Sequence, residues 1–582
     1  MHEFTVWAPK AKRVSVKAGE SQHAMSGPDE RGWWKATVQE AAPGTQYGFL
    51  LDDDPMVYPD PRSARQPDGV HSLSEIYDQS AFQWHDERWQ APPLASAVFY
   101  ELHTGTFTPE GTFDAAISRL DYLFDLGVTH VELMPVVEFV GNHGWGYDGV
   151  DLFAPHHAYG TPEELKKLVD ACHARGLAVI LDVVYNHLGP SGNYLRKYGP
   201  YFTNKFATFW GQGINFDGPD SGEVRRFFCD NALMWLRDFH FDGLRLDAVH
   251  GILDTSATHI LEQLKVEVEN LSAQLGRHLV LIPESDLNDP RLLWSRERGG
   301  FQLDAQWSDD FHHALHTVLT GETTGYYSDF GKLEHLAKVL RHAFVYDGTY
   351  SEHRRRMHGR PVDGLNGHRF LGYLQNHDQV GNRAIGDRSG RLMSLGRLKI
   401  GAALVLASPF TPMLFQGEEW AASTPFCFFT DHQEPELAKA VRDGRCREFE
   451  AFGWKPEDTA DPQAPETFHN SKLKWEEVSR APHAEMLEWH RKLIQLRRAE
   501  PSLSDGDLKA VRVRFNEAQQ WFAVERGLIT VACNLAPEGR GLPLGAGPWK
   551  LLLGSSAGVA LTGDNVIQLP PDSVAILRWG AL

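Results

Sequence analysis

Residues 241–250, FDGLRLDAVH, place an arginine and an aspartate two positions apart in a run that otherwise has the composition of a buried strand. Side chains at positions i and i+2 of a strand point to the same face, so Arg245 and Asp247 share one face and Leu244 and Leu246 the other. A buried charge is costly unless it is paired or used. The two charges are therefore either a structural ion pair or part of a functional site. The other residues of the chain distinguish between these two possibilities.

Polar residues also close other strand-like runs. LAVILDVVYNH ends with Asp182, Asn186 and His187, and FDGLRLDAVH ends with Arg245, Asp247 and His250. LVLIPESD ends with Glu284 and Asp286, and RFLGYLQNHD ends with His377 and Asp378. In a parallel barrel the carboxyl ends of all strands meet at one mouth. Asp247, Glu284 and Asp378 would then converge from three separate strands, which a purely structural arrangement does not explain.

Three converging carboxylates suit the cleavage of a glycosidic bond. Retaining glycoside hydrolysis needs a carboxylate nucleophile and a carboxylic acid about 5–5.5 Å apart. A guanidinium beside a carboxylate favours its charged form, so we expect Arg245 to keep Asp247 charged and oriented. The acid must stay protonated, and the apolar strand before Glu284 and its acidic neighbours should raise the pKa of Glu284.

The elements that position these residues change in character along the chain. Residues 1–90 read as short alternating strands, which predicts an immunoglobulin-like β-sandwich. Residues 91–500 alternate strand-like and helix-like runs, which predicts an α/β fold, a (β/α)8 TIM barrel with insertions. A doubly wound open sheet is the alternative, but no GxGxxG opens a helix after a strand. Residues 501–582 read as β again and predict a C-terminal β-sandwich domain.

Composition excludes several classes of protein. The formal net charge of −20 argues against partners such as nucleic acid or an anionic membrane surface. Five scattered cysteines without a CxxC suggest neither a disulfide framework nor a zinc site. No apolar h-region opens the sequence, and no apolar run reaches about 18 residues. We expect a soluble cytoplasmic protein that needs no cofactor, with a monomer favoured.

The segments LDVVYNH, DGLRLDAVH, PESD and QNHD resemble, in order and spacing, the four signature segments of the alpha-amylase family of glycoside hydrolases. This resemblance implies that Asp247 is the nucleophile, Glu284 the acid/base, and Asp378 the carboxylate that binds sugar hydroxyls and stabilises the transition state. It also implies a set of substrate-binding residues around the cleaved sugar: Tyr147, His187, Arg245 and His377. We expect His250, which follows the same strand as Asp247, to join them.

The segments YELHTGTFTPEGTFDAAISRLDYL, IPESDLNDPRLL and AQWSDDFHHALHTVLTGETTGYYSDF resemble a narrower group within that family. Its members cleave the α-1,4 bond next to the terminal trehalose of maltooligosyltrehalose, and they release trehalose and a maltooligosaccharide. The resemblance implies further sugar contacts from Asp309, Phe311, His312 and Arg383. Two alternatives stay open: a branching enzyme, which uses the same carboxylates with a sugar as acceptor, and a noncatalytic glycan-binding protein.

Several other sequence patterns are weaker evidence for a function. His312 and His316 have the i, i+4 spacing of a helical metal pair, but a third ligand is not evident. The oxygen-rich set that calcium prefers is also not evident, so we predict no metal. LGSSAGV fits the G-x-S-x-G pattern of a serine hydrolase, but no histidine follows it. The glycine-rich GQGINFDGPDSG is a substrate-side loop or a plain turn, and the basic run HRRRMHGR has no assigned place.

Overall fold

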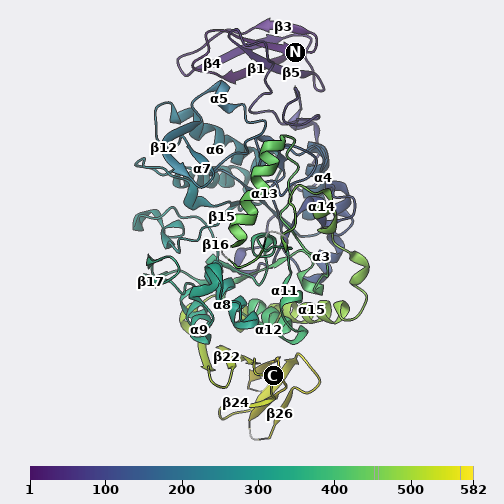
Figure 1. Cartoon of the computed structure of the whole chain (residues 1–582), viewed down its shortest axis with the longest axis vertical. Helices are drawn as coiled ribbons and strands as arrows, with labels where there is room; N and C mark the ends of the chain where they lie inside the picture. Colours follow the sequence, from purple (N-terminus) through teal and green to yellow (C-terminus); the bar gives the residue numbers. More distant parts are fainter. Residues whose placement is uncertain (451, 456–457, 564, 581–582) are drawn as a thin grey trace.

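The computed structural model describes residues 1–450, 452–455, 458–563 and 565–580 of the 582-residue chain. A β-rich N-terminal part occupies one end of an elongated molecule, an α/β barrel the middle, and a β-rich C-terminal part the other end (Figure 1). The two chain termini therefore lie at opposite ends. In the described part of the chain, no helix combines the length and apolar character needed to cross a membrane.

The central barrel is built on an eight-stranded parallel sheet. In spatial order its strands are β15 (Val280–Pro283), β14 (Gly243–Leu246), β11 (Ala178–Val183), β8 (His130–Leu133), β7 (Phe99–Leu102), β20 (Thr411–Phe415), β19 (Phe370–Gly372) and β16 (Gln306–Trp307). The amide of Asp304, just before β16, donates to the carbonyl of Leu281 in β15 at 2.9 Å, which brings the two edges together. The predicted (β/α)8 fold class is confirmed.

The strands of the barrel are buried along their whole length because side chains fill the inside and helices cover the outside. The longer helices are α4 (Pro162–Ala174), α6 (Ser221–Asp238), α7 (Ile260–Leu275), α8 (Asp309–Thr320), α9 (Leu333–His342), α12 (Leu395–Leu406) and α15 (His483–Ala499). Helix α4 begins at Pro162, and Thr161 and Glu164 form a capping box around this start.

One amphipathic run of the sequence does not form a single helix. TFDAAISRLDYLFDLG forms two short helices, α2 (Phe113–Ile117) and α3 (Leu120–Leu126). Between them the Ser118 hydroxyl donates back to the Ala115 carbonyl at 2.7 Å. Such local side-chain bonds compete with helix continuation. The remaining helices are α1 (Thr104–Phe107), α5 (Leu195–Tyr198), α10 (His377–Gly381), α11 (Ser389–Leu392), α13 (Pro435–Glu450), α14 (Pro465–Asn470) and α16 (Pro501–Ser504).

Three small antiparallel pairs are inserted between barrel elements and border the carboxyl ends of the strands. They are β9 (Val137–Glu138) with β10 (Asp151–Pro155), β12 (Phe202–Thr208) with β13 (Gly211–Ile214), and β17 (Thr349–Ser351) with β18 (Arg356–His358). The basic run HRRRMHGR lies in and around the last hairpin. Arg354 pairs there with Asp286, two residues after Glu284, at 3.2 Å. This run therefore lies at the mouth of the barrel.

The N-terminal part contains two antiparallel sheets. They are formed by β1 (His2–Trp7) with β4 (Trp33–Val38), and by β3 (Ser21–Ala24), β2 (Val14–Ala18), β5 (Gln46–Leu51) and β6 (Ser74–Glu75). Alternate residues of these strands, among them Phe4, Val16 and Phe49, are buried in the core. The Tyr198 hydroxyl of the barrel donates to the Pro59 carbonyl at 2.7 Å, which ties this part to α5.

The C-terminal part also contains two sheets. They are formed by β21 (Arg512–Asn516), β22 (Trp521–Arg526), β23 (Ile529–Asn534), β28 (Ser573–Trp579) and β25 (Trp549–Gly554), and by β24 (Arg540–Pro543), β27 (Val566–Leu569) and β26 (Ala560–Thr562). Helix α12 joins them to the barrel. The Lys399 ammonium donates to the Ser555 carbonyl at 2.9 Å, and Arg397 pairs with Asp572 at 3.0 Å.

Candidate active site

Arg245 is completely buried on β14 and contacts three carboxyl groups. Its Nη1 atom lies 2.7 Å from Asp247 Oδ1 and 2.8–2.9 Å from both oxygens of Asp182. Its Nη2 atom lies 3.5 Å from Glu284 Oε2. The guanidinium also lies over the Trp307 ring, 4.3 Å from the ring centre. The arginine and aspartate of the DGLRLDAVH run are thus an ion pair within a larger cluster of acids.

Asp247 directly follows β14 and is held from two sides. Its Oδ1 atom accepts from Arg245, and its Oδ2 atom accepts from the Asn186 side chain at 3.3 Å. Its own amide donates to the Val183 carbonyl at the end of β11 at 3.0 Å. The carboxylate is 11% exposed, so it faces the open end of the barrel while its partners lie beneath it.

Glu284 directly follows β15, beside Asp247. Burial raises the pKa of Glu284 well above its ordinary value. Arg245 opposes this shift, whereas Asp247, Asp309 and Asp378 add to it. The upward direction agrees with the sequence-based expectation for a carboxyl group that must stay protonated. Its Oε2 atom accepts a hydrogen bond from the Ala248 amide at 2.8 Å.

His377 lies between Asp378 and Glu101 of β7. Its Nδ1 atom lies 2.5 Å from an oxygen of Glu101 on β7, and its Nε2 atom lies 3.5 Å from Asp378. Burial alone would lower the pKa of His377, but Asp378 and Glu101 raise it to about 9. The imidazole is therefore a cation at neutral pH. Asp378 is 39% exposed and also accepts from Asn382 at 3.1 Å.

Tyr147 and His187 border the same cluster. The Tyr147 hydroxyl donates to Asp182 at 2.5 Å and lies 2.8 Å from His377 Nε2, and the two rings stack at 5.1 Å. His187 Nε2 lies 3.1 Å from the Tyr147 carbonyl. Burial lowers the pKa of His187, which favours a neutral ring. His250 is half-buried at the rim, 3.9 Å from Asp286.

The four residues suggested by the narrower resemblance lie in different environments. Asp309, at the start of α8, accepts from the Tyr373 hydroxyl at 2.6 Å, and burial raises its pKa to about 6. Phe311 does not line the mouth: it is completely buried and packs against Phe410 at 5.1 Å, because it lies on the core face of α8. The prediction of a sugar contact for Phe311 needs correction.

His312 and Arg383 belong to a network behind the mouth. His312 is 1% exposed and stacks on His316 at 5.3 Å and on Tyr373 at 5.7 Å, and its predicted sugar contact stays a prediction. His316 lies 2.8 Å from Glu322, which forms a bidentate pair with Arg383 at 2.8 and 2.9 Å. Arg383 is thus engaged with another side chain.

Some site residues were missed in the sequence. Glu101 lies one residue before the end of β7, close to the strand-end position that identified the other acids, so that pattern could have found it. Phe209 and Trp210 form the tip of the β12–β13 hairpin and are 92% and 39% exposed. The Trp210 ring stacks on His187 at 5.0 Å with an interplanar angle of 6°. Two adjacent aromatic residues directly before the glycine-rich run GQGINFDGPDSG were the signal for them.

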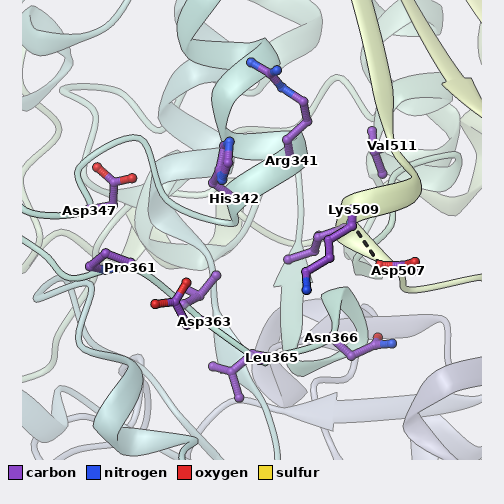
Figure 2. Close-up of a pocket in the computed structure, with 13 residues that line it drawn as sticks. Arg341, His342, Asp347, Pro361, Asp363, Leu365, Asn366, Asp507, Lys509 and Val511 are labelled. Carbon is purple, nitrogen blue, oxygen red and sulfur yellow. Dashed lines mark hydrogen bonds between the residues drawn. The ribbon is translucent and has the colours of Figure 1, made fainter.

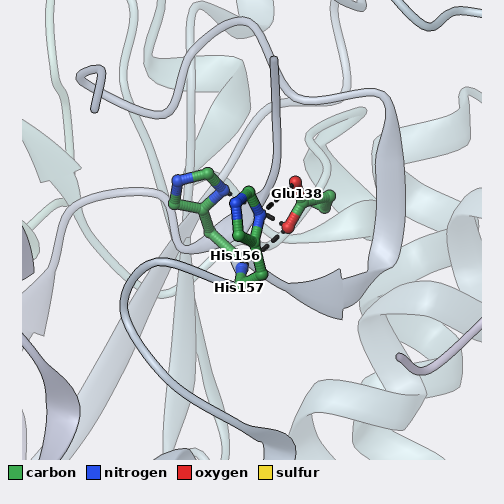
Figure 3. Close-up of side chains that lie close together, drawn as sticks. All are labelled: Glu138, His156 and His157. Atoms are coloured by element: carbon green, nitrogen blue, oxygen red, sulfur yellow. Dashed lines mark hydrogen bonds and ion pairs between the residues drawn. The ribbon is translucent and has the colours of Figure 1, made fainter. Parts of the chain in front are cut away.

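A second cluster of possible metal ligands lies on the β9–β10 insertion (Figure 3). One oxygen of Glu138 lies 2.9 Å from His157 Nδ1, and the other lies 3.3 Å from His156 Nδ1. The three ligand atoms are within 4.8 Å of one another. In the described chain, however, His156 Nε2 has no hydrogen-bond partner, whereas a metal-bound histidine usually has one. We interpret the group as a buried carboxylate that pairs with two histidines.

A cavity of about 940 Å³ lies between α9, residues 361–366 and the start of the C-terminal part (Figure 2). Its described lining includes Arg341, Asp363 and Lys509 but contains neither the three carboxylates nor any Trp, Tyr or Phe side chain. Sugars stack on such aromatic faces, so this cavity is a weaker candidate than the mouth of the barrel.

The barrel and its ring of carboxylates place the molecule in the alpha-amylase class of glycoside hydrolases. Residues 56–215 match the family model described as "Alpha amylase, catalytic domain", and residues 506–576 match "Domain of unknown function (DUF3459)". A solved structure titled as a putative alpha amylase from Salmonella typhimurium is similar over 99% of this chain and 97% of its own, with 39% identity and a TM-score of 0.90.

Curated relatives narrow the assignment. The malto-oligosyltrehalose trehalohydrolase of Rhizobium sp. (strain M-11) is 50% identical over 582 residues, covering 99% of this chain and 97% of its own. The one from Mycobacterium tuberculosis (strain ATCC 25618 / H37Rv) is 50% identical over 584 residues, covering 99% of both chains. The chain belongs to the malto-oligosyltrehalose trehalohydrolase family.

Proposed function

We propose that this enzyme hydrolyses the α-1,4-glucosidic bond next to the terminal trehalose of maltooligosyltrehalose and releases trehalose and a maltooligosaccharide. One observation carries the proposal: the chain is 50% identical, over nearly its whole length, to relatives named for this reaction. Asp247 and Glu284, which both contact Arg245, supply chemistry that suits it.

Glu284 donates its proton to the glycosidic oxygen while Asp247 attacks the anomeric carbon. The bond between that carbon and the trehalose oxygen breaks, and a glycosyl ester of Asp247 forms. Glu284, now ionised, then takes a proton from water, and the water oxygen displaces Asp247. Two inversions at one carbon give net retention. Asp378 and Tyr147 bind the sugar in subsite −1 during both steps, together with His187 and His377.

Asp309 and His250 lie on the rim of the mouth, where they contact the sugar beyond the cleaved bond.

The five cysteines are unpaired, as is usual in cytosolic proteins, which supports a cytoplasmic location. We further propose that the chain acts as a monomer without a cofactor, and that its three domains are divided near residues 90 and 500.

A paired digestion tests the proposed substrate. Maltotetraosyl-trehalose and maltohexaose, which contain the same number of glucose units, are incubated separately with the enzyme and the products are separated by chromatography. We expect free trehalose from the first and much slower cleavage of the second. Equal cleavage of both, or longer and branched products, would instead identify a general amylase or a branching enzyme.

A further inference from the structure

The catalytic carboxyl group of Glu284 has two chemically different oxygen atoms in this structure. Oε2 accepts the Ala248 amide at 2.8 Å and also faces Arg245 Nη2 at 3.5 Å. Both of these groups are donors and cannot accept a proton. Among the described residues, Oε1 has no hydrogen-bond partner. The two oxygen atoms of the Glu284 carboxyl group therefore have different hydrogen-bonding surroundings.

The backbone around Ala248 is shaped to make this contact. Ala248 has φ 38° and ψ 51°, a left-handed conformation that is unfavourable for a residue with a Cβ atom. The amide before it, from Asp247, donates to Val183 on one neighbouring strand, and the amide after it, from Val249, donates to the Glu284 carbonyl on the other, each at 3.0 Å. The turn at Ala248 points its own amide at the Glu284 side chain.

We propose that the Ala248 amide is a positioning group that holds Oε2 of Glu284 as an acceptor and so places the transferable proton on Oε1, the atom that faces the cleaved bond. This inference rests on the proposed role of Glu284 as the acid/base. When Glu284 has given up its proton, the same amide stabilises the anion, because a backbone donor favours the charged form of a carboxyl group. The amide thus contributes to orientation before proton transfer and to charge stabilisation after it.

Replacing the single amide by an ester tests the proposal, because the ester removes the donor and leaves every side chain unchanged. Lactic acid is incorporated in place of Ala248 in the full-length chain, and α-hydroxyisovaleric acid in place of Val249 provides the matched control. The control removes a neighbouring backbone hydrogen bond, to the Glu284 main chain, but leaves the carboxyl group untouched. Both proteins are compared with wild type on maltotetraosyl-trehalose and on α-maltosyl fluoride, whose leaving group needs little protonation.

For the Ala248 ester we expect kcat on maltotetraosyl-trehalose to fall about 10- to 100-fold, with KM changed less than about threefold. The basic limb of its pH profile should move to higher pH, and the loss on the fluoride should be less than about threefold. The Val249 ester should stay within about threefold of wild type on both substrates. Equal losses on both substrates, or an unmoved basic limb, would overturn the positioning role. A wild-type enzyme that cleaves the fluoride but releases no trehalose would instead contradict the proposed function.

Discussion

At the scale of single residues, Arg245 is a buried cation shared by Asp182, Asp247 and Glu284. Because Asp182 alone takes two of its contacts, the arginine stays paired if either catalytic acid is replaced. Buried charges that lose every partner destabilise a protein by about 3–5 kcal/mol, and this arrangement avoids that loss. Variants of the catalytic acids should therefore report on chemistry rather than on folding.

Asp247→Asn is expected to remove nearly all turnover and leave the fold intact. An amide is a poor nucleophile, so kcat on maltotetraosyl-trehalose should fall roughly 10⁴-fold or more. Initial rates measure the loss, and circular dichroism and the melting temperature check the fold. Residual activity above about one per cent in a folded variant would contradict the role of Asp247.

The pH dependence of the rate follows from Glu284. Its pKa is raised well above its ordinary value by burial, so its proton is retained in the acidic and neutral range and lost at higher pH. We expect kcat/KM on maltotetraosyl-trehalose to fall on the alkaline side with a limb well above pH 4.5, the ordinary value of a glutamate. A rate that begins to fall near pH 4.5 would show that Glu284 is not the acid.

At the scale of elements, sequence reasoning succeeded where a strand ends in a polar residue. Asp247, Glu284 and Asp378 were predicted to lie together because the carboxyl ends of parallel strands meet at one mouth, which depends only on the strands running parallel. Phe311 was misplaced because its helix turns this position towards the core, and a helical phase relative to the barrel cannot be read from a short motif. Trp210 was missed because its hairpin folds back over His187, a contact between distant segments.

The short helix η8 (Glu418–Trp420), just after β20, buries two acids. Burial raises the pKa of Glu418 to about 8 and that of Glu419 to about 7. A carboxyl group whose pKa is raised on folding stabilises the protein fully below its unfolded value of 4.5, and this contribution is lost as the pH rises through the folded pKa. The window for this loss is therefore pH 4.5 to about 8.

Glu418→Gln should make stability less dependent on pH, because glutamine cannot ionise but can still accept from the Phe415 amide. The melting temperature of the variant relative to wild type should rise from pH 5 to pH 8, by at least about 2 °C. Differential scanning calorimetry at several pH values gives this comparison. A difference between the two proteins that stays constant with pH would contradict the buried, protonated state of Glu418.

At the scale of the whole molecule, residues 84–90 cross the amino-terminal side of the barrel between the N-terminal part and β7. Asp86 lies 2.7 Å from His173 Nδ1 and 2.8 Å from His240 Nδ1. The Trp84 ring stacks on His240 at 3.7 Å, and the Trp89 ring stacks on His173 at 4.5 Å. These contacts anchor the connecting segment opposite the active site.

Asp86→Asn should weaken this anchor in a pH-dependent way. Burial alone would raise the pKa of Asp86, but its hydrogen bonds with His173 and His240 lower it below the ordinary 3.8. The contribution of Asp86 is therefore present above that value and is lost as the pH falls through the lowered pKa. We expect the variant to lose about 1–3 kcal/mol of unfolding free energy at pH 7 and less at pH 3.

Urea unfolding at both pH values measures the effect of Asp86→Asn. Asp53→Asn, on the exposed surface of the N-terminal part, is a suitable control, since its side chain is 90% exposed. Equal destabilisation by Asp86→Asn at pH 7 and pH 3 would show that the charge of Asp86 is not what holds the segment.

The placement of the two β-rich parts has a practical consequence. Because the chain begins at one end of the long axis and finishes at the other, its termini cannot be joined by a short linker (Figure 1). Circular permutation is therefore a poor route to new variants of this enzyme. Conversely, an affinity tag, a fusion partner or a surface attachment at one end would lie far from the other end, so the enzyme could be immobilised in two opposite orientations.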